Sequence, residues 1–395
     1  MSRWKIDLSI LWFGSFLVMS GMTMIIPFLP LYLQDLGIEG EHNVAMWAGA
    51  IFAANFVTSF LFQPLWAKLA DRFGFKVMLL RSGIGMAIIT ILMGLSQNAW
   101  QLLLLRLLNG TISGFNPVAI ALISSSAPKE RMGFAMGVLQ SGTIAGTILG
   151  PAIGGVLAEF IGFRPIFFLT GGCLLIASLL VLILVRDQFD RKSAAAKPQM
   201  SIIKGFSELR AIPQLQSLFA VTFVIQFANL STMPLMPLYI QQMHSDSTHI
   251  ALYAGLIGSV TGFSNMIASP ILGWLADRIG AQSILKFSLF GAAIICIPQA
   301  FVTTIWQLLI VRFLLGTCMA GLNPTVNALI RKYTPDGMVN RAYGFNSSFL
   351  SLGNIAGPTI GGLTSGLVGI PGVFLLSAAF MFANGFWVRA KLPKS

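Results

Sequence analysis

Charged side chains are scarce in this sequence. Only 10% of the 395 residues are charged and 55% are hydrophobic, which gives a mean hydropathy of +0.80. A soluble domain carries about 25% charged residues, so this composition excludes an ordinary soluble globular protein. Long apolar segments fill most of the chain instead, and roughly 20 such residues are enough for a helix to cross a bilayer. The sequence therefore predicts an all-α membrane protein.

Twelve apolar segments are long enough to span the membrane. The predicted spans are 8–33, 45–69, 76–96, 99–123, 133–158, 163–186, 214–240, 249–276, 283–303, 305–330, 340–368 and 371–390. The first segment is too long for the core of a signal peptide and is followed by no small-residue cleavage site. We therefore expect it to be retained as a helix.

Cysteine and histidine, which enzymes often use for catalysis or metal binding, are also few, and their positions fit no catalytic or metal-binding pattern. The three cysteines fall inside predicted spans without pair or metal spacing: Cys173, Cys296 and Cys318. The three histidines fall in predicted outer loops: His42, His244 and His249. There is no Ser-His-Asp spacing, and no P-loop that would bind a nucleotide. We expect neither an enzyme nor an ATP-driven pump, and no metal or cofactor.

Positive charge exceeds negative charge, with 25 Lys and Arg against 13 Asp and Glu and a net charge of +12. If both termini are cytoplasmic, nearly all the Lys and Arg fall on the cytoplasmic side. Arg106 and Arg312 lie inside spans, and Arg164 lies outside. The bias follows the positive-inside rule. It predicts a multi-pass protein of the cell membrane with both termini in the cytoplasm, and it argues against nucleic acid as a partner.

The chain repeats itself. The matching pairs are PFLPLYLQD (27–35) with PLMPLYIQQ (234–242), PLWAKLADRFG (64–74) with PILGWLADRIG (270–280), WQLLLLRLLNG (100–110) with WQLLIVRFLLG (306–316), and GPAIGG (150–155) with GPTIGG (357–362). Each repeat contains six predicted spans, an even number, so both halves enter the membrane in the same orientation. Such parallel repeats are related by an axis along the membrane normal.

The repeat predicts a domain organisation. We expect an N-terminal six-helix bundle over 1–187, a cytoplasmic linker over 188–213 and a C-terminal six-helix bundle over 214–395. Two like bundles can rock about a central site, which is alternating access. A duplicated membrane scaffold without transport is the alternative.

The motifs, in this order, resemble the major facilitator superfamily along nearly the whole chain. They are LADRFG with its copy LADRIG, the spacing Arg106-xxx-Gly110-xxx-Gly114, and GTILGPAIGG at 146–155. Within the superfamily the sequence resembles the twelve-span drug/proton antiporters of the multidrug efflux type. The first LADRFG copy departs from the family pattern, because Ala67 stands where a glycine is usual and Phe75 where a basic residue is common.

The resemblance implies a fold and a function. The fold is two six-helix bundles with a pseudo-two-fold axis along the membrane normal. The function is secondary-active exchange of bulky aromatic drugs, cationic or zwitterionic, such as fluoroquinolones or dyes, for protons. The transporter would act as a monomer in the lipid bilayer. The alternatives are an exporter of an endogenous lipid, sugar or peptide metabolite, and a membrane sensor that transports nothing.

The charged turn LADRFGFK (69–76) is a candidate conformational latch. Gly74 permits a tight reversal, and Asp71 can accept from N–H groups at the start of a neighbouring helix. The resemblance implies that the latch holds the outward-open state and breaks as the cytoplasmic side opens. The latch residues of the two halves are Asp71, Arg72, Gly74, Lys76, Glu130, Arg131, Asp277, Arg278 and Gly280. A solvated inner turn is the alternative.

Small residues recur every four positions in the fifth and eleventh spans. They give a smooth face for close helix approach, and a proline within the run bends the helix. In the antiporters that the sequence resembles, this motif forms a bendable seam that seals the cavity. The seam residues are Gly146, Gly150, Pro151, Gly154, Gly357, Pro358 and Gly361. Generic small-residue packing is the alternative.

Two arginines lie inside predicted spans, where a charge costs about 2.5–3.5 kcal/mol on insertion scales. Asp35, at the outer end of the first span, lies at the depth of Arg106, so we predict an Asp35–Arg106 pair that carries the proton. In the second half Gln242 replaces that acid and leaves Arg312 without one. Arginines that reach out to the membrane surface, and an Asp35 without a coupling role, are the alternatives. Whether Glu159 also titrates stays open.

The cargo site is predicted from apolar, aromatic and amide residues on the spans that should line a central cavity. They are Met22, Met24, Phe28, Asn116, Gln140, Gln226, Asn229, Met233, Asn323, Phe345 and Phe349. An apolar cavity with a few amides suits bulky, weakly polar, aromatic compounds. For any one of these residues, a lipid-facing or core position is the alternative.

Overall fold

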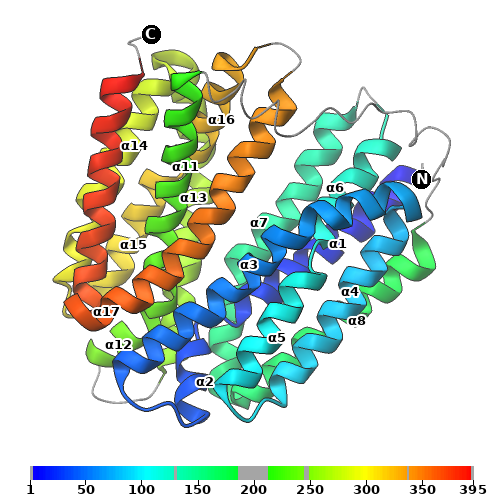
Figure 1. Cartoon of the computed structure of the whole chain (residues 1–395), viewed down its shortest axis with the longest axis horizontal. Helices are drawn as coiled ribbons and strands as arrows, with labels where there is room; N and C mark the ends of the chain where they lie inside the picture. The colour runs from blue at the N-terminus through cyan, green and yellow to red at the C-terminus, as the bar shows by residue number, and fades with distance from the viewer. Residues whose placement is uncertain (1–2, 129–130, 186–211, 244–248, 336–337, 393–395) are drawn as a thin grey trace. The chain divides into compact units, whose positions relative to one another are not determined.

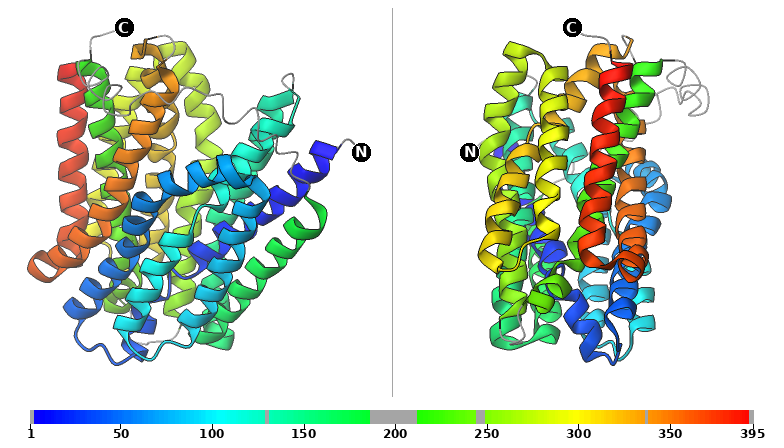
Figure 2. Two further views of the ribbon diagram at one scale, coloured as in Figure 1. Left: turned by 45° about the vertical axis from the view of Figure 1, so that its right-hand side comes forward. Right: turned by 90° about the vertical axis from the view of Figure 1, so that its left-hand side faces the viewer.

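The structure is a computed structural model that describes residues 3–128, 131–185, 212–243, 249–335 and 338–392. Within these residues every regular element is a helix (Figure 1). Eleven helices in the described part of the chain are long and apolar enough to cross a membrane. The longest, α17 (Val339–Lys391), turns at Gly369, where φ is 71° and ψ is 168°, and so contains both of the last two predicted spans (Figure 2). The predicted all-α membrane fold is confirmed.

The chain divides into two compact units, which are described separately. Unit 1 comprises residues 1–38 and 54–198, and unit 2 comprises residues 39–53 and 199–395. The predicted linker, 188–213, lies outside the described residues except for its last two. The predicted bundle boundaries, 1–187 and 214–395, therefore stay predictions.

The helices follow the order of the predicted spans (Figure 1). The helices of unit 1 are α1 (Arg3–Met24), α2 (Leu29–Asp35), α4 (Phe75–Gly94), α5 (Ala99–Ile112), α6 (Phe115–Ser126), α7 (Met132–Ile161) and α8 (Phe163–Leu184). The helices of unit 2 are α11 (Pro213–Thr232), η2 (Met233–Leu235), α12 (Met236–Met243), α13 (Ile250–Ile279), α14 (Ala281–Cys296), η3 (Pro298–Ala300), α15 (Ile305–Met319), α16 (Leu322–Tyr333) and α17. Helix α3 (Glu41–Phe73) contributes its start to unit 2 and the remainder to unit 1.

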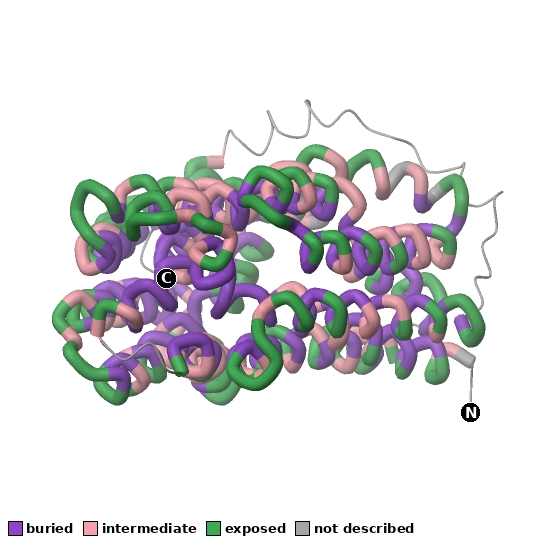
Figure 3. Tube along the Cα trace, turned by 90° about the horizontal axis from the view of Figure 1, so that it is seen from below, coloured by how far each residue is buried: buried purple, intermediate pink, exposed green. Residues whose placement is uncertain are grey.

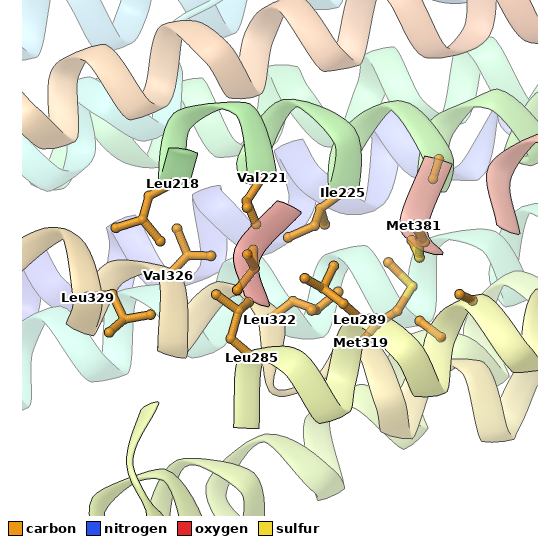
Figure 4. Packing of buried hydrophobic residues seen from close by; sticks show 14 of the residues in the cluster. Leu218, Val221, Ile225, Leu285, Leu289, Met319, Leu322, Val326, Leu329 and Met381 are labelled. Carbon is orange, nitrogen blue, oxygen red and sulfur yellow. The ribbon is translucent and has the colours of Figure 1, made fainter. Parts of the chain in front are cut away.

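Each unit has its own apolar core. In unit 1, five helices contribute the fully or almost fully buried side chains Leu11, Leu79, Phe115, Leu139 and Val181. The core of unit 2 is shown in Figure 4 and includes Leu218, Ile225, Leu285, Leu289, Met319, Val326 and Met381. Buried and exposed positions alternate along the helices in both units (Figure 3). Large apolar side chains cover much of the outside, as expected of helices that face lipid.

Within the first half, two of the predicted spans are interrupted rather than continuous. The first, 8–33, consists of α1 and α2, because Pro27 and Pro30 cannot donate backbone hydrogen bonds. The fourth, 99–123, breaks between α5 and α6 at Gly114, whose φ of 136° is open to glycine but strained for other residues. Non-helical backbone at membrane depth must be satisfied by neighbouring protein groups.

Candidate functional site

The glycines of the fifth predicted span lie directly against α1. A Cβ added at Gly142 would lie 2.7 Å from the carbonyl oxygen of Trp12, and one at Gly146 would lie 2.5 Å from that of Phe16. The same holds for Gly150, against Ser20 and Thr23, and for Gly154, against Met24. Pro151 lies within this helix, α7. The small-residue face is therefore a seam along which two helices pack backbone to backbone.

The second half builds the same seam between α11 and α17. A Cβ at Gly353 would lie 2.7 Å from the carbonyl oxygen of Phe223, and one at Gly357 would lie 2.8 Å from that of Phe227. Gly361 lies against Ser231 in the same way. Pro358 lies inside α17, as Pro151 lies inside α7. The two halves thus share this contact at three matching glycines, whereas Gly142 of the first seam matches Phe349 in the second half.

The first latch turn has the backbone that the sequence predicts. Gly74 has a φ of 94° and separates α3 from α4. Lys76 donates from Nζ to the carbonyl oxygen of Leu182 over 2.7 Å, at the C-terminal end of α8, where the helix dipole favours a cation. The side chain of Arg72 is exposed, with its guanidinium 5.5 Å from the ring of Phe73. The side chain of Asp71 lies outside the described part.

The remaining latch residues do not form a single cluster among the described residues. Glu130 lies outside the described part, and the neighbouring Arg131 is exposed at the start of α7. In the second copy, Gly280 has a φ of 91° and Asp277 is exposed. Arg278 stacks on Trp274, with the guanidinium carbon 3.9 Å from the ring centroid. The latch stays a prediction.

Arg312 is buried in α15, where it has partners of its own. The residue is 5% exposed, and Nη2 donates to Oγ1 of Thr232 over 3.3 Å and contacts the sulfur of Met236 at 3.7 Å. The guanidinium also lies 5.8 Å from the ring centroid of Phe374. These contacts replace the acid that the second half lacks at Gln242.

Arg106 is equally buried in α5 but has fewer polar contacts than Arg312. It is 5% exposed, and both Nε and Nη2 are without a hydrogen-bond partner. Asp35, the last residue of α2, is exposed, and these two described residues form no ion pair with each other. The structure therefore does not bring the predicted proton pair together in this conformation. The pairing stays a prediction.

Gln242 matches Asp35 in the repeat, so its position suggests Arg312 as its partner. It bonds to another residue instead. Its Nε2 donates to Oε1 of Glu41, the first residue of α3, within unit 2. The same stretch of α3 packs closely on α17, because a Cβ at Gly362 would lie 2.6 Å from the carbonyl oxygen of Ala45. An Asp at 242 would face Glu41 with a like charge, whereas an amide can donate to it. Sequence reasoning missed this contact.

A row of polar contacts joins α3 to α5 in unit 1, and sequence reasoning also missed it. Asn109 donates to the amide oxygen of Asn55 over 3.2 Å, and both residues are buried. Farther along, Thr58 donates to the carbonyl oxygen of Leu107 over 2.7 Å. Asn55 and Thr58 lie one turn apart in the second predicted span, so two polar residues at helical spacing were the available signal.

One acidic residue is more deeply placed than the sequence suggested. Asp7 precedes the first predicted span, 8–33, but lies in the second turn of α1 and is only 4% exposed. It is the one buried carboxylate among the residues whose side chains are described. Glu159 is exposed near the end of α7.

The predicted cargo residues differ in how much surface they offer. Two are exposed, Gln140 and Asn323. Seven are half-buried: Met22, Asn116, Gln226, Asn229, Met233, Phe345 and Phe349. Two are buried, Met24 and Phe28. Phe28 packs between Phe163 and Phe167, with ring centroids 5.4 and 5.7 Å away, and offers no surface to a ligand in this conformation.

The described part of the chain offers little to a metal ion. No group of three or more His, Cys, Asp or Glu side chains gathers there. The site is therefore built from buried arginines, amides, aromatic rings and close-packed glycines.

A family model of the Major Facilitator Superfamily matches residues 11–303 and 218–395. The chain belongs to the major facilitator superfamily. Its two matches overlap across the first half of the C-terminal repeat. The family prediction and the prediction of a transporter rather than an enzyme are confirmed, and the chain is a multi-pass membrane protein of this superfamily.

Curated relatives align with this superfamily member from end to end. Multidrug resistance protein MdtG of Enterobacter lignolyticus is 40% identical over 393 residues, which cover 100% of this chain and 94% of the relative. MdtG of Serratia proteamaculans is 40% identical over 99% of this chain and 95% of its own length. MdtG of Salmonella typhimurium is 38% identical over 98% and 95%. The chain therefore belongs to the MdtG family within the superfamily.

Solved structures show the same fold at low identity. The nucleoside transporter NupG superposes with a TM-score of 0.82 at 14% identity, covering 100% of this chain and 100% of the other. A bacterial homologue of the human lysosomal transporter Spinster, in an inward-facing and occupied conformation, gives 0.82 at 15% identity over 99% and 97%. These likenesses confirm the fold of this major facilitator protein.

Proposed function

We propose that this chain is a secondary-active multidrug exporter that exchanges bulky aromatic drugs, cationic or zwitterionic, for protons. The observation that carries the proposal is the 40% identity, over the whole chain, to proteins named multidrug resistance protein MdtG. The internal repeat supports it, because two like bundles can expose one central site to each side of the membrane in turn. The protein would act as a monomer in the cell membrane with both termini in the cytoplasm.

The proposed proton site is Asp35 with Arg106. An uncompensated buried charge is costly, and the guanidinium of Arg106 has two shielded nitrogens without partners. An anion that reached it would remove that cost, so Arg106 attracts an ionised Asp35 during the transport cycle. Protonation of Asp35 then releases the arginine, and a cationic or zwitterionic drug competes for the same charges.

The glycine seams and the charged turns would supply the moving parts. Helices that touch backbone to backbone can slide or bend with little side-chain rearrangement, and Pro151 and Pro358 lower the cost of bending. The turns at Gly74 and Gly280, with their neighbouring charges, would make and break contacts on the cytoplasmic side.

The test is ethidium transport into everted membrane vesicles with an imposed pH gradient, acidic inside. We expect wild type to accumulate ethidium and Asp35→Asn to lose the gradient-dependent part. Asp7→Asn is the matched control, because Asp7 is the buried carboxylate on the same unit and is assigned no coupling role.

Three outcomes would change the proposal. Wild-type uptake that ignores the pH gradient removes proton antiport, and repeating the assay with a sodium gradient then identifies a sodium-driven exporter. Loss of coupling in Asp7→Asn but not in Asp35→Asn moves the proton site to Asp7. Failure of wild type to move ethidium or a fluoroquinolone under any gradient removes the multidrug function.

A further inference from the structure

The break in the fourth span is capped by side chains from two neighbouring helices. Helix α5 ends at Ile112, and its last carbonyl groups have no partner within the helix. Trp66 of α3 donates from Nε1 to the carbonyl oxygen of Thr111 over 2.6 Å. Arg81 of α4 donates from Nη2 to that of Ser113 over 3.4 Å. The carbonyls of Thr111 and Ser113 are thus satisfied by side chains of neighbouring helices.

Arg81 and Trp66 also contact each other directly. The guanidinium carbon of Arg81 lies 3.6 Å from the centroid of the Trp66 ring, close enough for a cation–π contact. Both Nε and Nη1 of Arg81 are shielded and have no hydrogen-bond partner, so stacking and the single bond to Ser113 fix its position. A cation is also favoured at this place, because the C-terminal end of α5 carries partial negative charge.

A pair of serine hydroxyls, Ser59 and Ser113, adds further hydrogen bonds to the cap. Ser59 of α3 bonds to the hydroxyl of Ser113 and donates to the carbonyl oxygen of Gly110 over 3.2 Å. Gly114 follows with a φ of 136°, and a Cβ there would lie 3.6 Å from Nη2 of Arg81. The direction in which α6 leaves the break is therefore set by contacts with α3 and α4.

At the matching position, the described part of the second half has no such device. The matching repeats PLWAKLADRFG and PILGWLADRIG align Trp66 with Leu272 and Arg81 with Phe287. At the corresponding place between α15 and α16, Ala320 and Gly321 keep helical dihedrals. The cap and the sharp break thus occur together in the first half, and both are missing from the corresponding position of the second half.

The first polar side chain after the break is Asn116. Its amide oxygen is buried and has no hydrogen-bond partner. A buried polar group left unpaired is costly, and such groups in folded proteins call for an explanation. Asn116 shares a face of α6 with Ile120 and Ser124, which are exposed, whereas Phe115 and Ala119 face the core of unit 1.

We infer that Arg81 is a positioning residue for cargo recognition: by stacking on Trp66 and capping α5, it holds α6 so that the amide oxygen of Asn116, which is shielded in this conformation, accepts a hydrogen bond from the cargo when the transport cycle exposes it. The cargo class that satisfies Asn116 is an aromatic compound with an N–H donor on its ring system. The inference rests on the proposed function, because it names a feature of the drug that the exporter binds.

The test measures ethidium, whose ring carries amino groups, both as a bound ligand of the purified protein and as a transported one. We expect Arg81→Met, Trp66→Phe and Asn116→Ala each to raise the Kd and KM for ethidium about tenfold, the size of one lost charge-assisted or otherwise unreplaced hydrogen bond. Arg81→Lys keeps the charge without the planar stacking and should recover only part of the affinity. Phe287→Leu, at the matching place in the second half, should leave Kd unchanged.

A double variant distinguishes positioning from mere stability. If Arg81 acts through Asn116, then Arg81→Met should add little to the Kd in the Asn116→Ala background, whereas a merely destabilising effect would add to it. Additive effects on Kd, or unchanged binding in Arg81→Met and Trp66→Phe, would overturn the inference. Binding that obeys these expectations without gradient-driven efflux would instead remove the proposed function alone.

Discussion

The two buried arginines differ in their surroundings between the two halves of the repeat. Arg106 and Arg312 occupy matching places in the repeated motif and are equally buried. Arg312 is bonded to Thr232, whereas the repeat aligns Thr232 with Ile25, an apolar residue in the first half. The second half therefore offsets part of the cost of its cation locally, although Nε of Arg312 also has no hydrogen-bond partner, and the first half leaves more of that cost in place. A charge without a resident partner is free to take one up during a cycle.

The halves also differ at the break in the fourth span and at the corresponding place between α15 and α16. The first half has a glycine at positive φ, a capping arginine and a tryptophan at this place, and the second has a nearly continuous helix. The glycine seams, in contrast, have three matching close-packed glycines in each half. The two halves thus share the close packing of their helices, and they differ in polar contacts such as the cap on α5.

The largest expected effect separates the two arginines. Arg106→Gln should reduce gradient-driven ethidium efflux by about 100-fold or more, because it removes the charge that is proposed to exchange its partner. Arg312→Gln should retain at least about a tenth of the wild-type rate, since Arg312 is held by a hydroxyl and an aromatic ring. Efflux rates normalised to the amount of protein in the membrane measure this difference. Equal losses in the two variants would remove the asymmetry.

The seam should be sensitive in the same way in both halves. Gly146→Ala and Gly357→Ala each place a methyl group against a backbone carbonyl of the neighbouring helix, and overpacking of this kind costs about 1–3 kcal/mol. Thermal unfolding of the purified protein should show a lower Tm for each. Gly137→Ala on the same helix, α7, is the control, because nothing lies within 4 Å of its Cβ position. A control as unstable as Gly146→Ala would argue against a specific seam.

Exchanging the partners of the arginines tests the comparison directly. Thr232→Ile should leave Arg312 in the position of Arg106 and destabilise the protein by about 1–3 kcal/mol, the cost of an unpaired buried polar group. The reciprocal change, Ile25→Thr, should stabilise the fold and lower the efflux rate, because the new hydroxyl competes for Arg106. Chemical denaturation and vesicle efflux on the same preparations measure the two effects. An Ile25→Thr protein that transports faster than wild type would contradict the account.

The smallest expected effect concerns Gln242. Gln242→Glu would set a second carboxylate against Glu41, and because both side chains are exposed the cost should be only about 0.2–1 kcal/mol. The loss of Tm should shrink at high salt, since salt screens exposed charges. Glu41→Gln in the same chain should restore it. A salt-independent loss would point to packing rather than charge.

The general architecture was predictable because it depends on local composition. Apolar runs of membrane length, the internal repeat and the seam glycines are all readable along the chain. The cap on α5 was not, because Arg81 lies near the end of a span and reads as one more cytoplasmic charge. Its stacking on Trp66 depends on two helices meeting, as does the bond from Gln242 to Glu41. The Asp35–Arg106 pair was inferred from depth alone, and depth does not ensure contact.

The release of protons when drug is added tests most directly whether Asp35 carries the exchanged proton. Purified protein in a weakly buffered detergent solution, followed with a pH-sensitive dye, should release protons on addition of ethidium in proportion to the amount bound. Asp35→Asn should bind ethidium with no proton release, and Gln242→Ala should release as many protons as wild type. Full proton release by Asp35→Asn would contradict this role of Asp35.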